Sequence, residues 1–489
     1  MFHIDLTQYR LAFLAPEMIL CGFAFLLLLL GAFTRAESNR HSAGWIAVTG
    51  FAIAIAVAFA YRNAAVETLF GAIRVDGFSS FFKILIFAGS AIATFNSMDY
   101  LRRRDIQEAE YFALLVFAAI GMSLLASSSD LIAVLVCIEI MSLAVYVLVG
   151  IRPGDGLATE AALKYFTLGA FASGILVFGI ALVFGSAGSI HLDAIAAAAK
   201  SGAIADPTLF TVGLAMVLVG FAFKVAAVPF HMWAPDVYQG APAPVTGFMA
   251  MGVKAAAFAA AIRVFQVAFG AQFDDWRPIV WTLALVTMVL GNFLALMQDS
   301  VKRLLAYSSI AHAGYLLIGL AGRSEALTSA MMYYLGAYAF MTLGSFGVLA
   351  AISDGVGERD ALADWRGIGR RRPVLGALMA MFLFSLAGIP PFAGFFAKFY
   401  LFYAAVEAGD TALVLVAVTA SFVSLYYYLK VIVVMYMNEA EAGETGDGAE
   451  LGFGARAALA LSALGVLMLG LLPSRVLEWA ASAAPSLFR

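Results

Sequence analysis

The lysines of this sequence lie where charged residues are least expected. Six of the eight lysines fall inside long apolar stretches, whereas nearly all of the 21 arginines fall between those stretches or at their ends. A charge at the centre of a bilayer costs roughly 2.5–3.5 kcal/mol. Burial can bring the pKa of a lysine toward neutrality, whereas an arginine stays protonated. The selective use of lysine therefore indicates side chains that gain and lose protons. The six are Lys83, Lys164, Lys224, Lys254, Lys398 and Lys430.

Three of these lysines are the strongest candidates. Lys224 stands in FAFKVAAVPFHMW, just before Pro229, and Lys398 follows the two prolines of PPFAGFFAKFY. Proline removes a backbone donor, and broken backbone at membrane depth survives only where protein buries it or water lines it. Lys254, in MGVKAAAF, has small neighbours that leave room for water. We predict that these three lysines carry protons; the alternative for each is a fixed structural charge.

One acidic residue belongs with them. Glu139 lies near the middle of the apolar stretch LVCIEIMSLAVY and has no charged neighbour there. We expect it to face a buried lysine and to favour the charged form of that lysine. The alternative is a carboxyl group that only hydrogen-bonds to a neighbouring helix.

Four further residues are secondary candidates. Glu160 and Lys164 have the i, i+4 spacing of a favourable pair on a helix surface, so a structural role is equally compatible with them. His312, in SSIAHAGYL, can relay protons near neutral pH or simply donate to a carbonyl. His231 follows the Pro229 break, where it could serve at a channel mouth or anchor the chain at the interface.

Other charges have simpler expected roles. Lys83 and Lys430 lie toward the ends of apolar stretches, from which a long side chain can reach the interface. Asp299, Lys302 and Arg303 resemble a helix start with an orientation anchor.

The composition indicates the elements that must position these residues. The chain has 489 residues, of which 63% are hydrophobic and 12% charged, and its mean hydropathy is +0.93. A soluble domain keeps about a quarter of its residues charged, so lipid is the expected solvent. A helix needs about 20 apolar residues to cross a membrane. On that measure we predict an all-α polytopic membrane protein of about fourteen spans, near 11–33, 42–61, 78–98, 110–127, 130–151, 162–185, 207–230, 242–267, 276–297, 302–320, 326–352, 373–406, 410–437 and 453–472.

Two of these spans are expected to be broken, at Pro229 in the seventh and at Pro390-Pro391 in the twelfth. The offset of five spans is odd, so a second copy of the unit would be inverted in the membrane, as in many ion-translocating proteins. We therefore predict two inverted five-helix repeats that form two linked half-channels. The expected divisions are 1–109 with three spans, 110–267 and 276–437 with one half-channel each, and 438–489 with the last span.

Cations predict the orientation. They cluster in the segments after odd-numbered spans, including Arg35, Arg40, Arg102, Arg103, Arg104, Arg152, Arg303 and Arg370. The positive-inside rule then places both termini, Met1 and Arg489, on the periplasmic side. The acidic loop Glu439–Glu450 falls on the cytoplasmic side.

Three long segments carry a resemblance to a known family. FKVAAVPFHMWAPDVYQGAPAPVTGF, DSVKRLLAYSSIAHAGYLLIGL and SLAGIPPFAGFFAKFYLF resemble the antiporter-like subunits of proton-pumping NADH:quinone oxidoreductase, respiratory complex I. The resemblance covers roughly residues 110–437. Within the family, the lysine in the second broken helix and the APDVYQGAPAPVT segment are similar to the subunit N group.

The resemblance implies roles for the candidate residues. It assigns Glu139 and Lys224 to the pair of the first half-channel, Lys254 to the central lysine and Lys398 to the second half-channel. By the same resemblance, further polar positions of a hydrophilic axis are Glu160, Lys164, His231 and His312.

It also implies what lies elsewhere. The family places NAD, FMN, iron–sulfur clusters and quinone in partner subunits, which predicts a proton-translocating enzyme subunit without cofactor or metal of its own. In agreement, we find no GxGxxG motif after a strand and no cysteine cluster. The expected partners are other membrane-arm subunits and the lipid of a bacterial inner membrane, with no nucleic acid and no directly bound soluble substrate. Two alternatives are a subunit of a multi-subunit cation/proton antiporter and a structural membrane scaffold.

Overall fold

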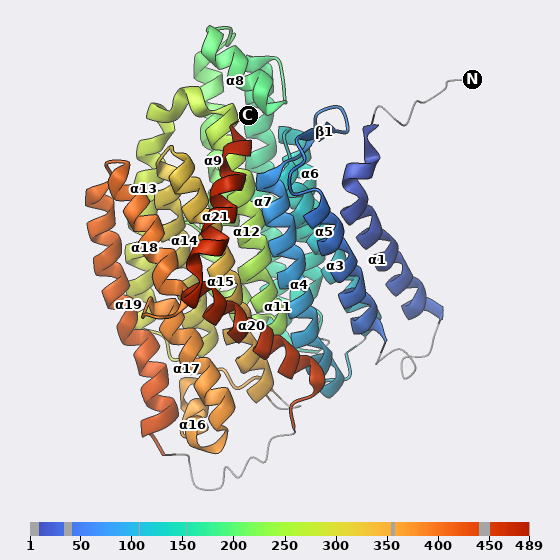
Figure 1. Ribbon diagram of the computed structural model, residues 1–489, viewed down its shortest axis with the longest axis vertical. Helices are drawn as coiled ribbons and strands as arrows, with labels where there is room; N and C mark the ends of the chain where they lie inside the picture. Colours follow the sequence, from blue (N-terminus) through green and yellow to red (C-terminus); the bar gives the residue numbers. More distant parts are fainter. Residues whose placement is uncertain are drawn as a thin grey trace.

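The computed structural model describes residues 9–33, 42–106, 108–152, 154–353, 357–439 and 450–488. Figure 1 shows a bundle of long helices lying side by side, with one small hairpin at one end. In the hairpin, β1 (Val66–Thr68) pairs antiparallel with β2 (Ile73–Val75). Among the described residues there is no other named strand. The all-α prediction is confirmed.

Thirteen helices within the described residues are long and apolar enough to cross a membrane. Two shorter helices, α17 (Pro373–Ala387) and α18 (Ala393–Glu407), are the halves of a fourteenth, broken one. The prediction of about fourteen spans is therefore confirmed, whereas the repeat pattern and the divisions stay predictions. The continuous spans are α1 (Ala15–Phe33, preceded by η2, Leu11–Leu14), α3 (Ala43–Ala60), α4 (Gly77–Arg103), α5 (Glu108–Ser127), α6 (Leu131–Val149), α7 (Gly156–Ala187), α9 (Pro207–Lys224), the composite helix Ala243–Ala268, α13 (Phe273–Leu296, preceded by η5, Gly270–Gln272), α14 (Val301–Ala321), α15 (Glu325–Ile352), α19 (Thr411–Met437) and α20 (Phe453–Leu471).

Both expected breaks are present. In the twelfth crossing, α17 ends at Gly388, whose φ of +89° favours glycine, and α18 begins at Ala393, after the two prolines. In the seventh crossing the break starts earlier than Pro229, because α9 ends at Lys224 itself. A short helix, α10 (Trp233–Gly240), then continues the chain. Each break leaves helix-end carbonyls without partners in their own helix.

The composite eighth span contains a feature that the sequence did not predict. It consists of α11 (Ala243–Phe248), a π turn η3 (Met249–Val253), α12 (Lys254–Arg263) and a second π turn η4 (Val264–Ala268). Its apolar window is fully buried inside the bundle. Single π turns inside α-helices are frequently found at functional sites. The position of Lys254, directly after the first π turn, therefore supports a functional role for this lysine.

Close packing brings α14 against α13. A Cβ atom added to Gly314 would lie 2.5 Å from the backbone nitrogen of Met288, which no side chain tolerates. Transmembrane helices associate through such small residues, because lipid offers no hydrophobic drive between helices. The contact fixes the face that α14 turns toward the interior.

The last crossing is longer than the predicted 453–472. α20 ends at Leu471, and α21 (Pro473–Ala483) with η7 (Ala484–Leu487) carries the chain onward, as Figure 1 shows in red. Pro473 cannot continue the hydrogen bonding of α20, which explains the bend. Ser486 then accepts a hydrogen bond from the backbone of Phe78 at the start of α4. The remaining elements are short: α8 (Leu192–Ser201), η6 (Leu362–Trp365) and α16 (Ile368–Arg371).

Two lysines expected near the membrane surface are buried instead. Lys83, only 1% exposed, forms an ion pair with Glu17 of α1 at 2.7 Å. Lys302, also 1% exposed, forms one with Glu358 at 2.5 Å. The expectation for Lys83 failed because Glu17 comes from a helix distant in the sequence, so the Lys83 side chain does not need to reach the interface. Lys302 lies in the first turn of α14, as predicted, but pairs with a carboxylate from another segment. Lys430 remains partly exposed, 3.1 Å from Asp299.

Glu358 shows why the Lys302 pair is stable. Burial opposes ionisation of its carboxyl group, but the Lys302 ammonium and the Arg152 guanidinium outweigh burial and hold the pKa of Glu358 below its ordinary value. Its carboxylate also accepts hydrogen bonds from Tyr100 and from the backbone of Ala243. Lys302 and Glu358 therefore form a buried ion pair in which both charges have hydrogen-bond partners.

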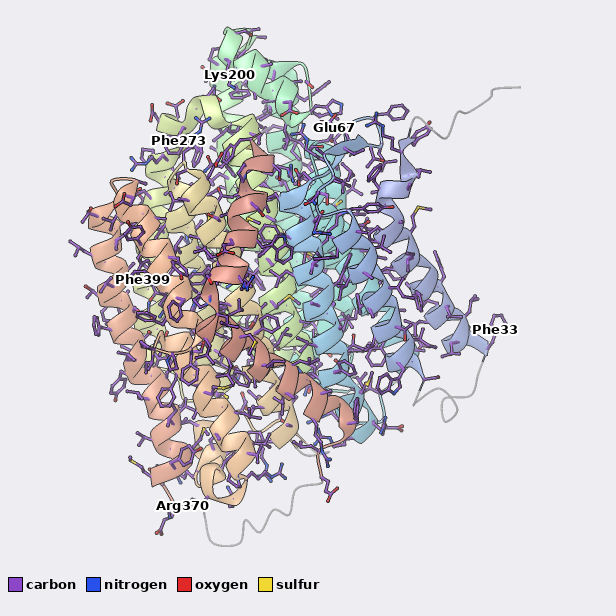
Figure 2. All side chains as sticks on the ribbon, viewed as in Figure 1. Phe33, Glu67, Lys200, Phe273, Arg370 and Phe399 are labelled. Atoms are coloured by element: carbon purple, nitrogen blue, oxygen red, sulfur yellow. The ribbon has the colours of Figure 1, made fainter. Side chains whose placement is uncertain are left out.

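The two ends of the bundle differ. Glu67, Lys200 and Phe273 lie at one end, which we name the hairpin end, and Arg370 lies at the other, which we name the arginine end (Figure 2). Met1, Arg35, Arg40, Arg489 and residues 440–449 of the acidic loop fall outside the described residues.

We expect the hairpin end to face the periplasm. Alkaline phosphatase fused after Arg489 should then be active, and green fluorescent protein at the same place should be dark, because the positive-inside rule keeps the arginine end in the cytoplasm. The opposite pair of results would show that the orientation is inverted.

Candidate functional site

Helix α14 carries the centre of the site. Ser309, His312 and Tyr315 follow one another at a spacing of three residues on its buried side. The Lys254 amine donates to the backbone carbonyl of Ser309 at 2.5 Å and to its hydroxyl group. The same amine lies 5.3 Å from the ring centroid of Tyr338. Lys254 is thus held by hydroxyl, carbonyl and aromatic groups.

His312 lies one turn further along this face. Its Nδ1 is 2.6 Å from the hydroxyl oxygen of Tyr334, and its Nε2 is 3.3 Å from that of Tyr428. Tyr428 also shares a hydrogen bond with Ser308. Since a neutral imidazole donates from one nitrogen and accepts at the other, and each tyrosine does both, protons can pass through this group in either direction.

Lys398 lies at the other end of the row. Its amine donates to the carbonyl of Ala387 at 2.9 Å and to the Ser421 hydroxyl at 2.7 Å. Ala387 is the last residue of α17, so its carbonyl has been freed by the break and forms part of the negative end of the helix dipole, which the Lys398 amine faces. The ring of Tyr315 lies 5.3 Å from the amine. The same ring lies 5.7 Å from the His312 ring, centroid to centroid, while the Tyr315 hydroxyl group contacts Asn292.

Lys224 occupies a separate position at the end of α9. Its amine donates to the Ser142 hydroxyl of α6 at 2.8 Å. Glu139 lies one turn before Ser142 on α6 and accepts from Ser173 of α7 at 2.6 Å. Among the described residues no ion pair within 4 Å joins Glu139 to Lys224. The expected direct pairing is therefore not observed, since Lys224 bonds to Ser142 and Glu139 bonds to Ser173.

The four secondary candidates differ in whether they lie near the row on α14. Lys164 forms ion pairs with Glu160 at 2.7 Å and with Asp236 at 2.8 Å. The Lys164 and Glu160 side chains are 42% and 58% exposed. His231 is half-buried in the link between α9 and α10. Of the four, the structure brings only His312 into the row on α14.

The site shows no arrangement for a metal ion. No group of three or more His, Cys, Asp or Glu side chains within the described ranges could hold one.

Comparison with known proteins identifies the family of the chain. The family model described as NADH:quinone oxidoreductase/Mrp antiporter, TM, matches residues 128–424. That range is more than half of the chain and includes Glu139, Lys224, Lys254, His312 and Lys398. The chain belongs to this family.

Individual members of the antiporter family extend the match over nearly the whole chain. "NADH-quinone oxidoreductase subunit N 1" of Solibacter usitatus is 43% identical over 98% of both chains. A chain of respiratory complex I from Thermus thermophilus is 36% identical, with 95% of this chain and 99% of that chain covered and a TM-score of 0.78. A chain of the Mrp complex from Dietzia sp., 23% identical with 97% of each chain covered and a TM-score of 0.85, shows the shared fold alone.

A groove in the side of the bundle is lined by Lys398. Its volume is about 460 Å³, and its lining is almost wholly apolar. Phe399, which lines it, lies at the side of the bundle at mid-height (Figure 2). Lys398 is therefore the member of the row nearest to the outer surface of the subunit.

Sequence reasoning found the charged members of the antiporter-family site but not their partners. Ser142, Ser309 and Ser421 each bind one lysine from a different helix. The signal for Ser309 was present in SSIAHAGYL, three residues before His312. The tyrosines around His312 come from α15 and α19, so no local spacing could reveal them.

Proposed function

We propose that this chain is the proton-translocating subunit N of a bacterial NADH:quinone oxidoreductase. The observation that carries the proposal is the row on α14, in which Ser309 binds the Lys254 amine, His312 contacts two tyrosine hydroxyl groups and the Tyr315 ring contacts the Lys398 amine. Protons pass along this row by successive transfers between nitrogen and hydroxyl groups. Lys224, next to Glu139, supplies the first half-channel.

The partners of the lysines support this role. Among the described residues, Lys224, Lys254 and Lys398 have no carboxylate within 4 Å, whereas Lys83 and Lys302 do. A carboxylate favours the charged form of a lysine. A hydroxyl group instead hydrogen-bonds to the charged and the neutral amine alike. The partners of the three lysines in the row therefore suit proton exchange without a carboxylate.

The redox chemistry belongs to partner subunits of the membrane arm and beyond it. NAD, FMN, iron–sulfur clusters and quinone are placed there by this proposal, and quinone reduction drives the lysine cycle. The chain lies in the bacterial inner membrane with its hairpin end outward. The relatives at 40% identity or more are named for NADH-quinone oxidoreductase, which favours this function over a cation/proton antiporter.

Glu139→Ala should lower proton pumping while the complex still assembles. The change removes the negative charge that favours the protonated form of Lys224. For a partly exposed charge the loss is up to about 1 kcal/mol, which corresponds to about fivefold in pumping rate. Proton uptake by inverted vesicles driven by NADH measures the effect, and co-migration with NADH dehydrogenase activity on a native gel measures assembly.

Glu160→Ala is the matched control, because it removes a carboxylate from an exposed ion pair outside the row. It should pump like the parent. An assembled Glu139→Ala complex with parental pumping would remove Glu139 from the pathway. A chain that never co-migrates with NADH dehydrogenase activity would point to the separate antiporter instead.

A further inference from the structure

A second buried acid–base pair lies outside the row. Glu17 of α1 and Lys83 of α4 are 4% and 1% exposed, and their charged atoms are 2.7 Å apart. Ser123 of α5 donates to the same Glu17 oxygen. The three helices precede the range that the family model matches, and the proposed function does not use the pair.

Burying the charges of this pair costs free energy of solvation, and a purely structural link between the helices would not need charges. The second oxygen of Glu17 and the amine of Lys83 are both buried and make no further hydrogen bond among the described atoms. Well-packed apolar residues in place of a buried ion pair are often as stable or more stable. An ionisable pair inside a membrane is a functional hypothesis by default.

Buried serines at the end of α5 and directly after it lie between the pair and the hairpin end, and each donates its hydroxyl proton to a backbone carbonyl. Ser127 lies one turn after Ser123 on α5, and its hydroxyl donates to the Ser123 carbonyl at 3.1 Å. Ser128 and Ser129 follow directly and are also buried. Asp130 is the next residue of the chain, and its carboxylate is 3.4 Å from the His191 ring. His191 is 46% exposed, so this row ends in water.

Polar groups continue on the other side of the pair. Along α4, Ser90, Thr94 and Ser97 share one face with Lys83, at spacings of seven, four and three residues. All three are buried. The Ser97 hydroxyl is 2.8 Å from that of Tyr111 on α5. This second row runs toward the arginine end.

We infer that Glu17 and Lys83 form a proton-exchange site in the N-terminal helices, open to the hairpin end through the α5 serines, Asp130 and His191. The Lys83 ammonium gives its proton to the Glu17 carboxylate, which leaves a neutral amine and a carboxylic acid. Glu17 then releases that proton along the hydroxyl row to water, and Lys83 is reprotonated from the side of Ser90. The inference rests on the proposed function and adds a route separate from the lysine row.

The test replaces both charges at once. Glu17→Gln with Lys83→Met keeps the volumes and leaves no unpaired buried charge, so the chain should assemble. We expect the assembled complex to pump measurably fewer protons per NADH oxidised than the parent, because one of two routes is lost while the lysine row still works. Pumping at the parental rate would mean that the pair is only structural and would overturn the inference.

A second variant keeps the test decisive if the double variant does not assemble. Ser123→Ala with Ser127→Ala interrupts the hydroxyl row with two small buried changes and should also slow pumping. Ser186→Ala is its control, a buried serine that donates to its own helix in α7. Parental pumping by the serine variant overturns the route. If Lys254→Ala stops pumping while both of these variants pump normally, the proposed function stands and only this inference fails.

Discussion

Lys254→Arg should stop proton pumping as completely as Lys254→Ala, although arginine keeps the positive charge. The Lys254 amine is held by the carbonyl and hydroxyl groups of Ser309 and by the face of Tyr338. A guanidinium group can satisfy these partners, but it does not deprotonate at any accessible pH. If the lysine must release a proton in each cycle, the arginine variant blocks the row. The expected loss is about 10²-fold or more, as for removal of a proton-transfer group.

The measurement is NADH-driven proton uptake by inverted vesicles, normalised to assembled complex. Lys430→Arg is the matched control, because Lys430 is partly exposed beside Asp299 and lies outside the row. It should pump normally. A fixed structural charge makes the opposite prediction for Lys254: arginine works and alanine fails. Full pumping by an assembled Lys254→Arg complex would therefore remove proton release at this position.

Arg263→Met should prevent the subunit from accumulating in the membrane. Arg263 is 1% exposed and forms two hydrogen bonds with Asp76, at 2.9 and 3.0 Å. Removing one partner of a buried ion pair leaves the other charge uncompensated, which costs about 3–5 kcal/mol. The cost approaches the whole stability of many domains. Immunoblots of washed membranes report the amount of the subunit.

Asp76→Asn should restore much of this loss when combined with Arg263→Met. The amide removes the unpaired charge but keeps an oxygen for the Ser79 backbone, which Asp76 caps at the start of α4. Arg456→Met is the control, because the Arg456–Glu450 pair is largely exposed at 3.7 Å. Normal accumulation of Arg263→Met alone would show that the bundle tolerates an unpaired Asp76.

Hydropathy predicted the spans because each crossing must satisfy its backbone hydrogen bonds internally, which requires a long apolar helix. Proline predicted the break between α17 and α18 for a similarly local reason, since Pro390 and Pro391 lack the donors that a helix needs. Lys224, Lys254 and Lys398 were found because a charge in an apolar run is visible without knowledge of its neighbours. These are properties of one segment at a time.

What the sequence did not reveal depends on segments far apart. Lys83 was expected to reach the interface because it lies near the end of its own helix. Its partner Glu17 lies in another helix and is not visible from the local sequence. Lys302 lies at a helix start, as predicted, but its ion pair was not foreseen, since Glu358 follows a different span. The tyrosines around His312 and the serine beside each lysine are ordinary residues of their helices. Only packing makes them part of a site.

The two π turns that bound α12 have a mechanical consequence. A residue passed from a π turn into regular α-helix would rotate the helix on one side against the other by about 100°. Arg263 is bonded twice to Asp76 of α4, so the end of α12 near Val264–Ala268 is clamped. Rotation is then left to the turn Met249–Val253, which directly precedes Lys254. Lys254 therefore follows directly after the turn at which its helix can rotate. A change of register in that turn would move the Lys254 amine away from Ser309.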